Sequence, residues 1–367
     1  MSEHESAVAA LAGDLVRIDS RSFLSNLPIA ERVEAALGGF EIERVDYTDP
    51  AGVAKRALVA RRGEGGLAFS GHLDTVPDTG WQEDPWSGRI EGGVLRGLGS
   101  TDMKGPVAAA IVAARALPER VPVSLLISAD EETTKAGARA IAERSDLVRR
   151  SPPRAILVAE PTAMVPVRGH RSHIEYTIVA TGLQAHSSTG RGRNANWEML
   201  PFLMEMKGLY ERLRSDVSLQ DPAYDPPFSD FNLIIDNHGT AVNVTVPKAT
   251  ARIKFRYSAS VDPSPVQQAV HEAASRAGLH LVEEREGFPP ELPLDHKLVR
   301  LCVEVTGAAP RTAPFGTDAS ELQSVAPCVV LGPGDIAVAH TPGETVRLAD
   351  LAAAVPVFMR LAERLAG

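Results

Sequence analysis

The spacing of hydrophobic and polar positions changes character part-way along the chain. In the first half, apolar runs that suit buried strands alternate with stretches whose apolar residues recur at helical spacing. We expect helices over residues 8–18, 30–37, 107–117 and 135–143, and strands over residues 67–71, 121–129 and 155–159. Strands that alternate with helices indicate crossover connections, and therefore a mostly parallel sheet flanked by helices.

After about residue 171 the order of elements is different. Strands are expected over residues 173–181, 231–236, 249–257 and 279–284, and helices over residues 194–213 and 263–277. The order strand, helix, strand, strand, helix, strand is that of a ferredoxin-like unit. Residues 328–331 then resume as a core strand, and residues 348–365 as a closing helix. We predict an α/β domain of residues 1–172 and 286–367, interrupted by a smaller ferredoxin-like α+β domain of residues 173–285.

Composition and charge limit the kinds of molecule that this protein is expected to bind. The 367 residues are 44% hydrophobic and 23% charged, which is ordinary for a globular protein of about two domains. The formal charge of −9 argues against nucleic acid or an anionic membrane as a partner. Two cysteines cannot form a disulfide framework, and we find neither a signal peptide nor an apolar run of the roughly 18–20 residues that span a membrane. We therefore expect a cytoplasmic protein that acts on a small molecule.

Acids and histidines gather where the expected parallel strands end. His72 and Asp74 follow the first of these strands, Glu131 and Glu132 the second, and Glu160 the third. The carboxyl ends of parallel strands share one edge of a sheet, and ligands bind there. Two loop residues can reach the same edge. They are Asp102, which precedes the helix at residue 107, and His340, which follows the strand at residues 328–331.

Each of these residues alone has an ordinary explanation, such as a hydrogen-bonded histidine, a helix N-cap or a turn acid. Together they pose an electrostatic problem, because buried carboxylates without a counter-charge raise their own pKa values or destabilise the fold. Lys104 is the one cation within these motifs. Divalent metal ions remove the difficulty, and carboxylate and imidazole ligands suit Zn²⁺, Mn²⁺ or Co²⁺.

The motifs also resemble a known family. S-G-H-L-D-T-V-P, G-S-T-D-M-K-G-P, S-A-D-E-E-T and A-E-P-T, in this order, are similar to those of the M20 family of metallo-aminoacylases and peptidases. A-H-S-S and L-G-P-G-D-I-A-V-A-H-T-P-G-E resemble its acetylornithine deacetylase branch. The resemblance spans essentially the whole chain and implies hydrolysis of the amide bond of an N-acyl amino acid. Desuccinylase, carboxypeptidase or dipeptidase activity is the alternative on the same scaffold. A homodimer formed through the inserted lid domain is also implied.

The resemblance further implies how the residues share the chemistry. His72, Asp102 and Glu160 would hold one metal ion, and Glu132, Asp102 and His340 the other, with the Asp102 carboxylate bridging the two. Zinc is the first expectation for both ions, with cobalt or manganese as alternatives.

The remaining implied roles concern catalysis and substrate binding. Glu131 would be the general acid and base, and Asp74 would accept the imidazole N–H of His72. His186 would stabilise the oxyanion from across the dimer interface. The substrate-binding residues would be Arg256, Asn243, Gly316 and Thr317.

Overall fold

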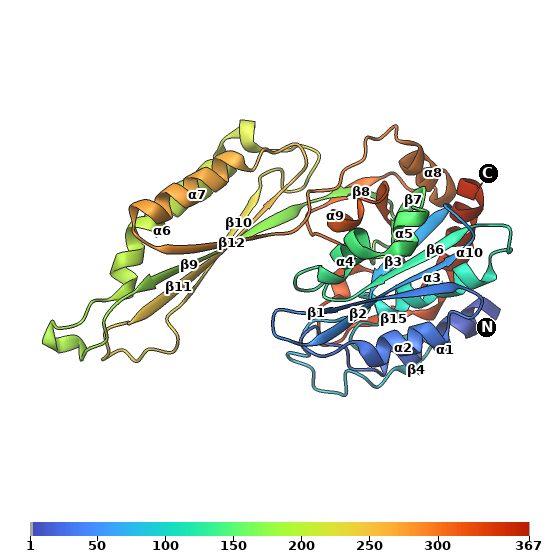
Figure 1. Ribbon diagram of the computed structural model, residues 1–367, viewed down its shortest axis with the longest axis horizontal. Coiled ribbons are helices and arrows are strands. Elements are labelled where there is room, and N and C mark those ends of the chain that lie inside the picture. Colours follow the sequence, from blue (N-terminus) through green and yellow to red (C-terminus); the bar gives the residue numbers. More distant parts are fainter. Residues whose placement is uncertain (1–2, 367) are drawn as a thin grey trace. The chain divides into compact units, whose positions relative to one another are not determined.

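The computed structural model describes residues 3–366, which divide into two compact units (Figure 1). Unit 1 contains the described residues up to Gly169, Pro290–Thr312 and those from Thr317 onward. Unit 2 contains His170–Pro289 and Ala313–Gly316. Residues 1, 2 and 367, which we assigned to the larger domain, lie outside the described residues.

Unit 1 is built around a mixed sheet. Its helices are α1 (Glu3–Val16), α2 (Leu27–Ala35), α3 (Lys104–Ala116), α4 (Ala136–Arg144), α5 (Asp146–Arg150), α8 (Lys297–Thr306), α9 (Ala319–Leu322) and α10 (Leu348–Ala366). Its main strands are β1 (Glu41–Thr48), β2 (Ala54–Arg62), β3 (Leu67–His72), β6 (Val123–Ser128), β7 (Ala155–Val158), β8 (Val167–His170), β13 (Arg311–Ala313) and β14 (Cys328–Val330). Within residues 3–366 these strands form one sheet in the order β1-β2-β6-β3-β7-β14-β8-β13.

The centre of this sheet is parallel, and its strands are buried on both faces. β3 pairs in parallel with β6 on one side and β7 on the other, and β14 continues the parallel run beside β7. All residues of β3, β6 and β7 are buried, so these strands read as continuous apolar runs. Alternate side chains, such as Phe69 and Leu125, join the core formed with α1, α3 and α10. Phe69 and Phe358 of α10 contact each other with ring centroids 5.3 Å apart.

A small second sheet in unit 1 joins two distant parts of the chain. It pairs β5 (Val94–Arg96) with β4 (Arg89–Glu91) and with β15 (Thr345–Arg347). The register places Thr345 opposite Arg96. The segment that follows His340 is therefore fastened beside the segment that leads to Asp102.

Unit 2 is an antiparallel sheet with two helices. Its elements are β9 (Ser172–Thr181), α6 (Ala195–Ser215), β10 (Asp230–Asp236), β11 (Lys248–Tyr257), α7 (Ser264–Arg276) and β12 (His280–Arg285), with short 3₁₀ turns at Ser187–Thr189 and Val217–Leu219. The strand order in the described chain is β10-β11-β9-β12, and both helices lie on one face of the sheet (Figure 1). Alternate residues of β9, including Ile174, Tyr176 and Ile178, are buried in the core beneath the helices. The predicted fold class, an α/β sheet domain with a separate α+β unit, is confirmed.

No helix among residues 3–366 is both long and apolar enough to cross a bilayer.

Candidate active site

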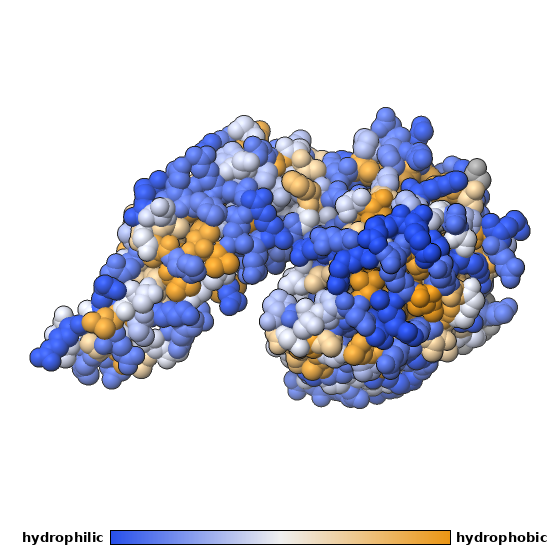
Figure 2. Space-filling view, in the orientation of Figure 1, coloured by the Kyte–Doolittle hydropathy of each residue, from blue (hydrophilic) through white to orange (hydrophobic). Residues whose placement is uncertain are grey.

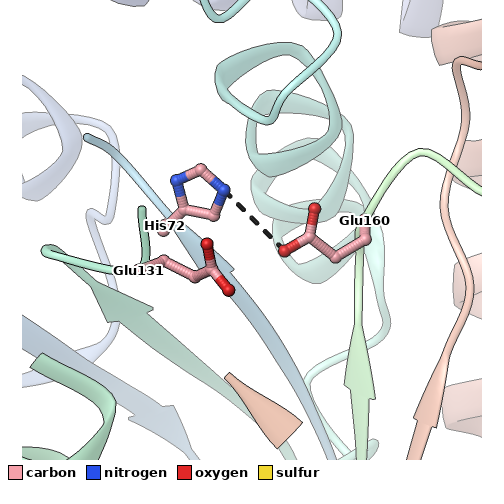
Figure 3. A group of neighbouring side chains, drawn as sticks. All are labelled: His72, Glu131 and Glu160. Carbon is pink, nitrogen blue, oxygen red and sulfur yellow. Dashed lines mark ion pairs between the residues drawn. The ribbon is translucent and has the colours of Figure 1, made fainter. Parts of the chain in front are cut away.

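Three neighbouring strands deliver the first residues of the site to one edge of the sheet. His72 ends β3, Glu131 lies beyond the end of β6, and Glu160 lies beyond the end of β7. Because β3 lies between β6 and β7, the three side chains converge (Figure 3). His72 Nε2 is 3.7 Å from Glu160 Oε1. His72 and Glu160 are buried, and the Glu131 side chain is 10% exposed.

Asp102 and His340 arrive at the same cluster from loops. Asp102 Oδ1 lies 3.1 Å from His72 Nε2, and its Oδ2 lies 3.3 Å from His340 Nε2. His340 Nε2 is also 3.0 Å from Glu132 Oε1. One carboxylate therefore faces two histidines with its two oxygens. Asp102 does not cap a helix, since α3 begins at Lys104 with Met103 in the N-cap position.

Asp74 contacts His72 and the main chain of both glutamates, and so holds three residues of the cluster in place. Its main-chain oxygen lies 3.0 Å from His72 Nδ1, closer than its carboxylate at 3.5 Å. Since a carbonyl oxygen only accepts, His72 Nδ1 carries a proton, and His72 Nε2 faces the carboxylates of the cluster. The Asp74 carboxylate accepts hydrogen bonds from Ser22 Oγ and from the N–H groups of Glu131 and Glu132. Asp74 therefore fixes the turn that carries both glutamates as well as the imidazole.

Burial and mutual repulsion shift the pKa values of the cluster. Burial raises the pKa of Glu131 and of Glu160 well above the usual carboxyl range. Burial would also raise the pKa of Asp102, but hydrogen bonds from His340 and His72 outweigh it and lower that pKa. Hydrogen bonds to Asp102 and Glu132 raise the pKa of His340 to about 11. The two histidines thus serve as counter-charges to the acids, a role that bound cations can take over.

The donor set fits divalent metal ions. Ligand atoms of His72, Glu131 and Glu160 lie within 4.8 Å of one another, and so do those of His72, Asp102 and Glu132. Imidazole nitrogen and carboxylate oxygen suit zinc, manganese and cobalt. Deprotonated acids and neutral imidazoles bind such ions, so metal binding would release the protons that the raised pKa values retain.

Three buried lysines lie beside the cluster, and of these only Lys104 belongs to the sequence motifs. Lys55 of β2 lies 2.8 Å from Asp130 Oδ1, and Lys135 Nζ lies 3.8 Å from Glu131 Oε1. Lys104 is buried and donates to the carbonyl of Ile18, and burial lowers its pKa to about 8. A sequence pattern shows none of these contacts, because each joins residues whose positions depend on the folded turns.

Asp318 is a further acid, for which the sequence indicated no role of its own. It is 1% exposed, and its Oδ2 accepts a hydrogen bond from Ser128 Oγ. Its Oδ1 has no hydrogen-bond partner within residues 3–366. Burial raises the pKa of Asp318 to about 6. Its position directly after Gly316-Thr317 is the one signal that pointed toward it.

The residues expected to bind substrate are divided between the units. His186, Asn243, Arg256 and Gly316 belong to unit 2, and Thr317 belongs to unit 1. His186 and Asn243 lie on adjoining segments, since the N–H of Ser187 donates to the Asn243 carbonyl. Arg256 Nη1 lies 2.9 Å from Asp230 Oδ2, and Thr317 Oγ1 accepts from the N–H of Ala319.

Comparison with known proteins identifies the family. Residues 68–364 match Peptidase family M20/M25/M40. The chain belongs to this family. An acetylornithine deacetylase of Myxococcus xanthus is 32% identical over 100% of both chains, and one of Proteus mirabilis (strain HI4320) is 33% identical over 85% of this chain and 82% of its own. An M20 family metallo-carboxypeptidase from Sulfolobus solfataricus has the same fold, with a TM-score of 0.77 at 16% identity over 100% of this chain and 99% of that one.

Membership of the M20 family confirms the resemblance read from the motifs. The M20 chain is a hydrolase that acts on amide bonds. Its cluster of carboxylates and histidines is a candidate metal-binding site of the kind this family uses.

Proposed function

We propose that this M20 hydrolase removes the acyl group, acetyl in the first instance, from an N-acyl amino acid with the help of two divalent metal ions. The observation that carries the proposal is the Asp102 carboxylate, whose two oxygens face His72 and His340, with Glu131 beside the same cluster. The relatives named acetylornithine deacetylase, at 32–33% identity, support the acetylated substrate class.

The proposed ligands divide into two sets that share one carboxylate. His72, Asp102 and Glu160 would hold one ion, and Glu132, Asp102 and His340 the other. When bound, the ions polarise the scissile carbonyl and make a water molecule more acidic. Zinc is the proposed ion, with cobalt or manganese as alternatives that the ligand types also suit.

Glu131 is the proposed general base and acid. It lies next to the cluster without being needed as a ligand in either set, so its carboxylate is available to move a proton. Burial raises the pKa of Glu131, which makes its carboxylate a stronger base than an exposed glutamate. Glu131 would take a proton from the attacking water and return it to the amine nitrogen that leaves. Lys135, whose Nζ is 3.8 Å away, limits the rise in that pKa.

His186 is the proposed donor to the oxyanion. The N–H of Ser188 donates to His186 Nδ1, so the neutral imidazole carries its proton on Nε2. Nε2–H is therefore ready to donate to the negative oxygen that develops during hydrolysis. We propose that His186 acts from the partner subunit.

Substrate recognition is proposed for four further residues. Arg256 would bind the substrate carboxylate, and to do so it would exchange its present partner, Asp230. Asn243, next to the His186 segment, would bind the polar part of the substrate, and the turn at Gly316 and Thr317 would contact its main chain.

Dimerisation through unit 2 is supported by its unpaired edge. β10 is an edge strand in the described sheet and exposes Leu233, Ile234 and Ile235, which are 40%, 58% and 48% exposed. Trp197 and Met204 of α6 are also exposed, and the surface of unit 2 carries a hydrophobic patch (Figure 2). We propose that two copies pair there and that unit 2 serves as the lid and dimerisation domain.

We also propose a cytoplasmic location, since the two buried thiols persist best in a reducing compartment.

The function is tested by product analysis with a matched pair of variants. The zinc-loaded enzyme should release acetate from N-acetylornithine or a related N-acetyl amino acid. Glu131→Gln should keep its metal and lose about 10²- to 10⁴-fold in kcat, whereas Glu132→Gln should lose metal. Equal turnover by Glu131→Gln would refute its assigned role. Release of succinate, or of a C-terminal glutamate from a peptide, would establish the desuccinylase or carboxypeptidase alternative.

The dimer is tested by sedimentation with variants on opposite edges of one sheet. Ile234→Lys on β10 should shift the protein to monomer, because it places a charge in the proposed interface. Val282→Lys on β12, at a position that is 43% exposed, should leave the dimer intact. A wild-type protein that sediments as a monomer at micromolar concentration would refute the proposal, and His186 would then have to act within its own chain.

A further inference from the structure

Glu344 is a buried carboxylate that holds the turn bearing Asp102. It is 1% exposed and lies four residues after His340. Its Oε1 accepts the N–H groups of Thr101 and Asp102 at 2.8 and 2.9 Å, and its Oε2 accepts the N–H of Gly99 at 3.1 Å. Three main-chain donors to one carboxylate form charge-assisted hydrogen bonds, which are stronger than bonds between neutral groups.

The main chain adds a second set of contacts between the same two segments. The N–H of Gly97 donates to the Glu344 carbonyl at 3.2 Å, and Thr101 Oγ1 donates to the Thr345 carbonyl at 2.9 Å. β15 and β5 then continue the pairing, with Thr345 opposite Arg96. The segment carrying His340 and the segment carrying Asp102 are therefore fastened together directly beside the cluster, although they lie more than 200 residues apart in the chain.

The Asp102 carboxylate has a demanding geometry. Its two oxygens must face His72 and His340 at the same time, at 3.1 and 3.3 Å. A rotation that improves one contact worsens the other, so the main chain of Asp102 must be held in place. Glu344 binds that main chain at the N–H of Asp102 itself.

We propose that Glu344 is a positioning residue that orients Asp102 toward His340 and thereby sets the affinity of the metal ion that these two residues share. Glu344 itself is not one of the proposed metal ligands, since both of its oxygens accept main-chain N–H groups. The inference rests on the proposed function only in requiring that the cluster bind divalent ions. A carboxylate with this role has to be charged and of glutamate length, because both of its oxygens accept.

Glu344→Gln is the discriminating variant. A glutamine places an NH₂ group opposite a main-chain N–H, so at least one of the three hydrogen bonds must break while the side-chain volume is preserved. Glu43→Gln is the matched control. Glu43 also accepts main-chain N–H groups, those of Asp146 and Leu147, but on the edge strand β1.

The measurement is calorimetric titration of Zn²⁺ into chelator-treated full-length protein, with metal content determined in parallel. Wild type and Glu43→Gln should each bind two ions per chain. For each ion, the affinity of Glu43→Gln should equal that of wild type. Glu344→Gln should bind at least one of the two ions about 10- to 100-fold more weakly, the range found when groups behind a metal ligand are altered. Unfolding of the metal-free protein in urea reports any loss of stability separately.

Two results would overturn the proposal while leaving the proposed function standing. One is a Glu344→Gln variant with wild-type affinities for both ions, and the other is an equal weakening by both glutamine variants. A wild-type protein that binds no divalent ion would overturn the proposed function and this inference together. If Glu344→Gln does not fold, Thr101→Val removes one contact from the same pair of segments. It should weaken the same ion by a smaller factor, and unchanged affinity there would refute the role.

Discussion

The buried pair of Lys55 and Asp130 allows a quantitative test of how the turn that carries Glu131 and Glu132 is supported. Their side chains are 0% and 2% exposed and lie 2.8 Å apart. Tyr47 donates to the second carboxylate oxygen of Asp130 at 2.9 Å. Asp130 has a φ of +63°, and its carbonyl accepts the N–H groups of Thr134 and Lys135. The pair therefore anchors the turn from which Glu131 and Glu132 extend.

Lys55→Met removes the cation but keeps most of the side-chain volume. Breaking a buried ion pair by removing one partner costs about 3–5 kcal/mol, because the remaining charge is buried without compensation. Asp130 keeps the hydrogen bond from Tyr47 and can take up a proton. We therefore expect a loss near the lower limit of that range, about 3 kcal/mol at pH 7.

The loss of stability in Lys55→Met should depend on pH in a definite direction. Burial already raises the pKa of Asp130, and the loss of Lys55 raises it further. An aspartate in the unfolded chain titrates near 3.9. Above that pH the folded variant retains a proton that the unfolded chain has released, so its stability falls as pH rises through the folded-state pKa. The deficit relative to wild type should therefore be larger at pH 7 than at pH 5.

Urea unfolding of the metal-free protein, followed by far-ultraviolet circular dichroism, measures this loss. The control is Lys207→Met, because Lys207 is 77% exposed and pairs with Glu211 at 3.5 Å on the surface of α6. Surface pairs contribute about 0–1 kcal/mol, so the control should unfold almost as wild type does. A Lys55→Met variant within about 1 kcal/mol of wild type at pH 7 would refute the reasoning, since a buried pair must cost more than a surface pair. A deficit that is the same at both pH values would refute it too.

Three further predictions concern other parts of the molecule. Burial raises the pKa of Cys302 to about 12 and also raises that of Cys328, so a thiol reagent should label neither in the native state and both in urea. Gly66→Ala should destabilise more than Gly39→Ala by about 1–3 kcal/mol in urea unfolding. Both glycines have positive φ, but only the Cβ at residue 66 would meet the Pro122 carbonyl oxygen, at 2.1 Å. Adding Zn²⁺ at 100 times its Kd to chelator-treated protein should stabilise it by about 2.7 kcal/mol for each site filled, measured as a rise in Tm, and no rise would contradict a metal site.

The parallel centre of the fold could be predicted because its strands are uniformly apolar. β3, β6 and β7 are buried on both faces, so their sequences differ sharply from the neighbouring helices. β1 and β2 escaped prediction because they are rich in charge. β2 carries Lys55 in a buried position, and such a lysine suits a strand only once Asp130 lies opposite it. Nothing near Lys55 in the sequence indicates that partner.

The residues of the candidate site also divide into those whose position the sequence predicts and those whose position it does not. His72, Glu131 and Glu160 follow recognisable strands, so the rule about strand ends predicts that they meet. Asp102 and His340 lie in loops, which have no regular path, so the sequence alone marked them only as candidates, and their place in the ligand sets came from the family resemblance. No role was predicted for Glu344, which ends the motif containing His340, or for Asp318, which follows Gly316-Thr317, because their importance lies in which main-chain groups and hydroxyls they contact. A lone acid between turns has no spacing from which such contacts can be inferred.

The place of β14 in the sheet has a consequence for biosynthesis. This strand lies between β7 and β8, yet it is translated after the whole of unit 2. During synthesis one edge of β7 therefore stays unpaired while more than 150 further residues are translated. Exposed strand edges favour aggregation. A chain that terminates early, before Cys328, would keep that open edge and would also lack the histidine at 340. Completion of the sheet and completion of the proposed metal site thus both depend on segments that are translated after unit 2.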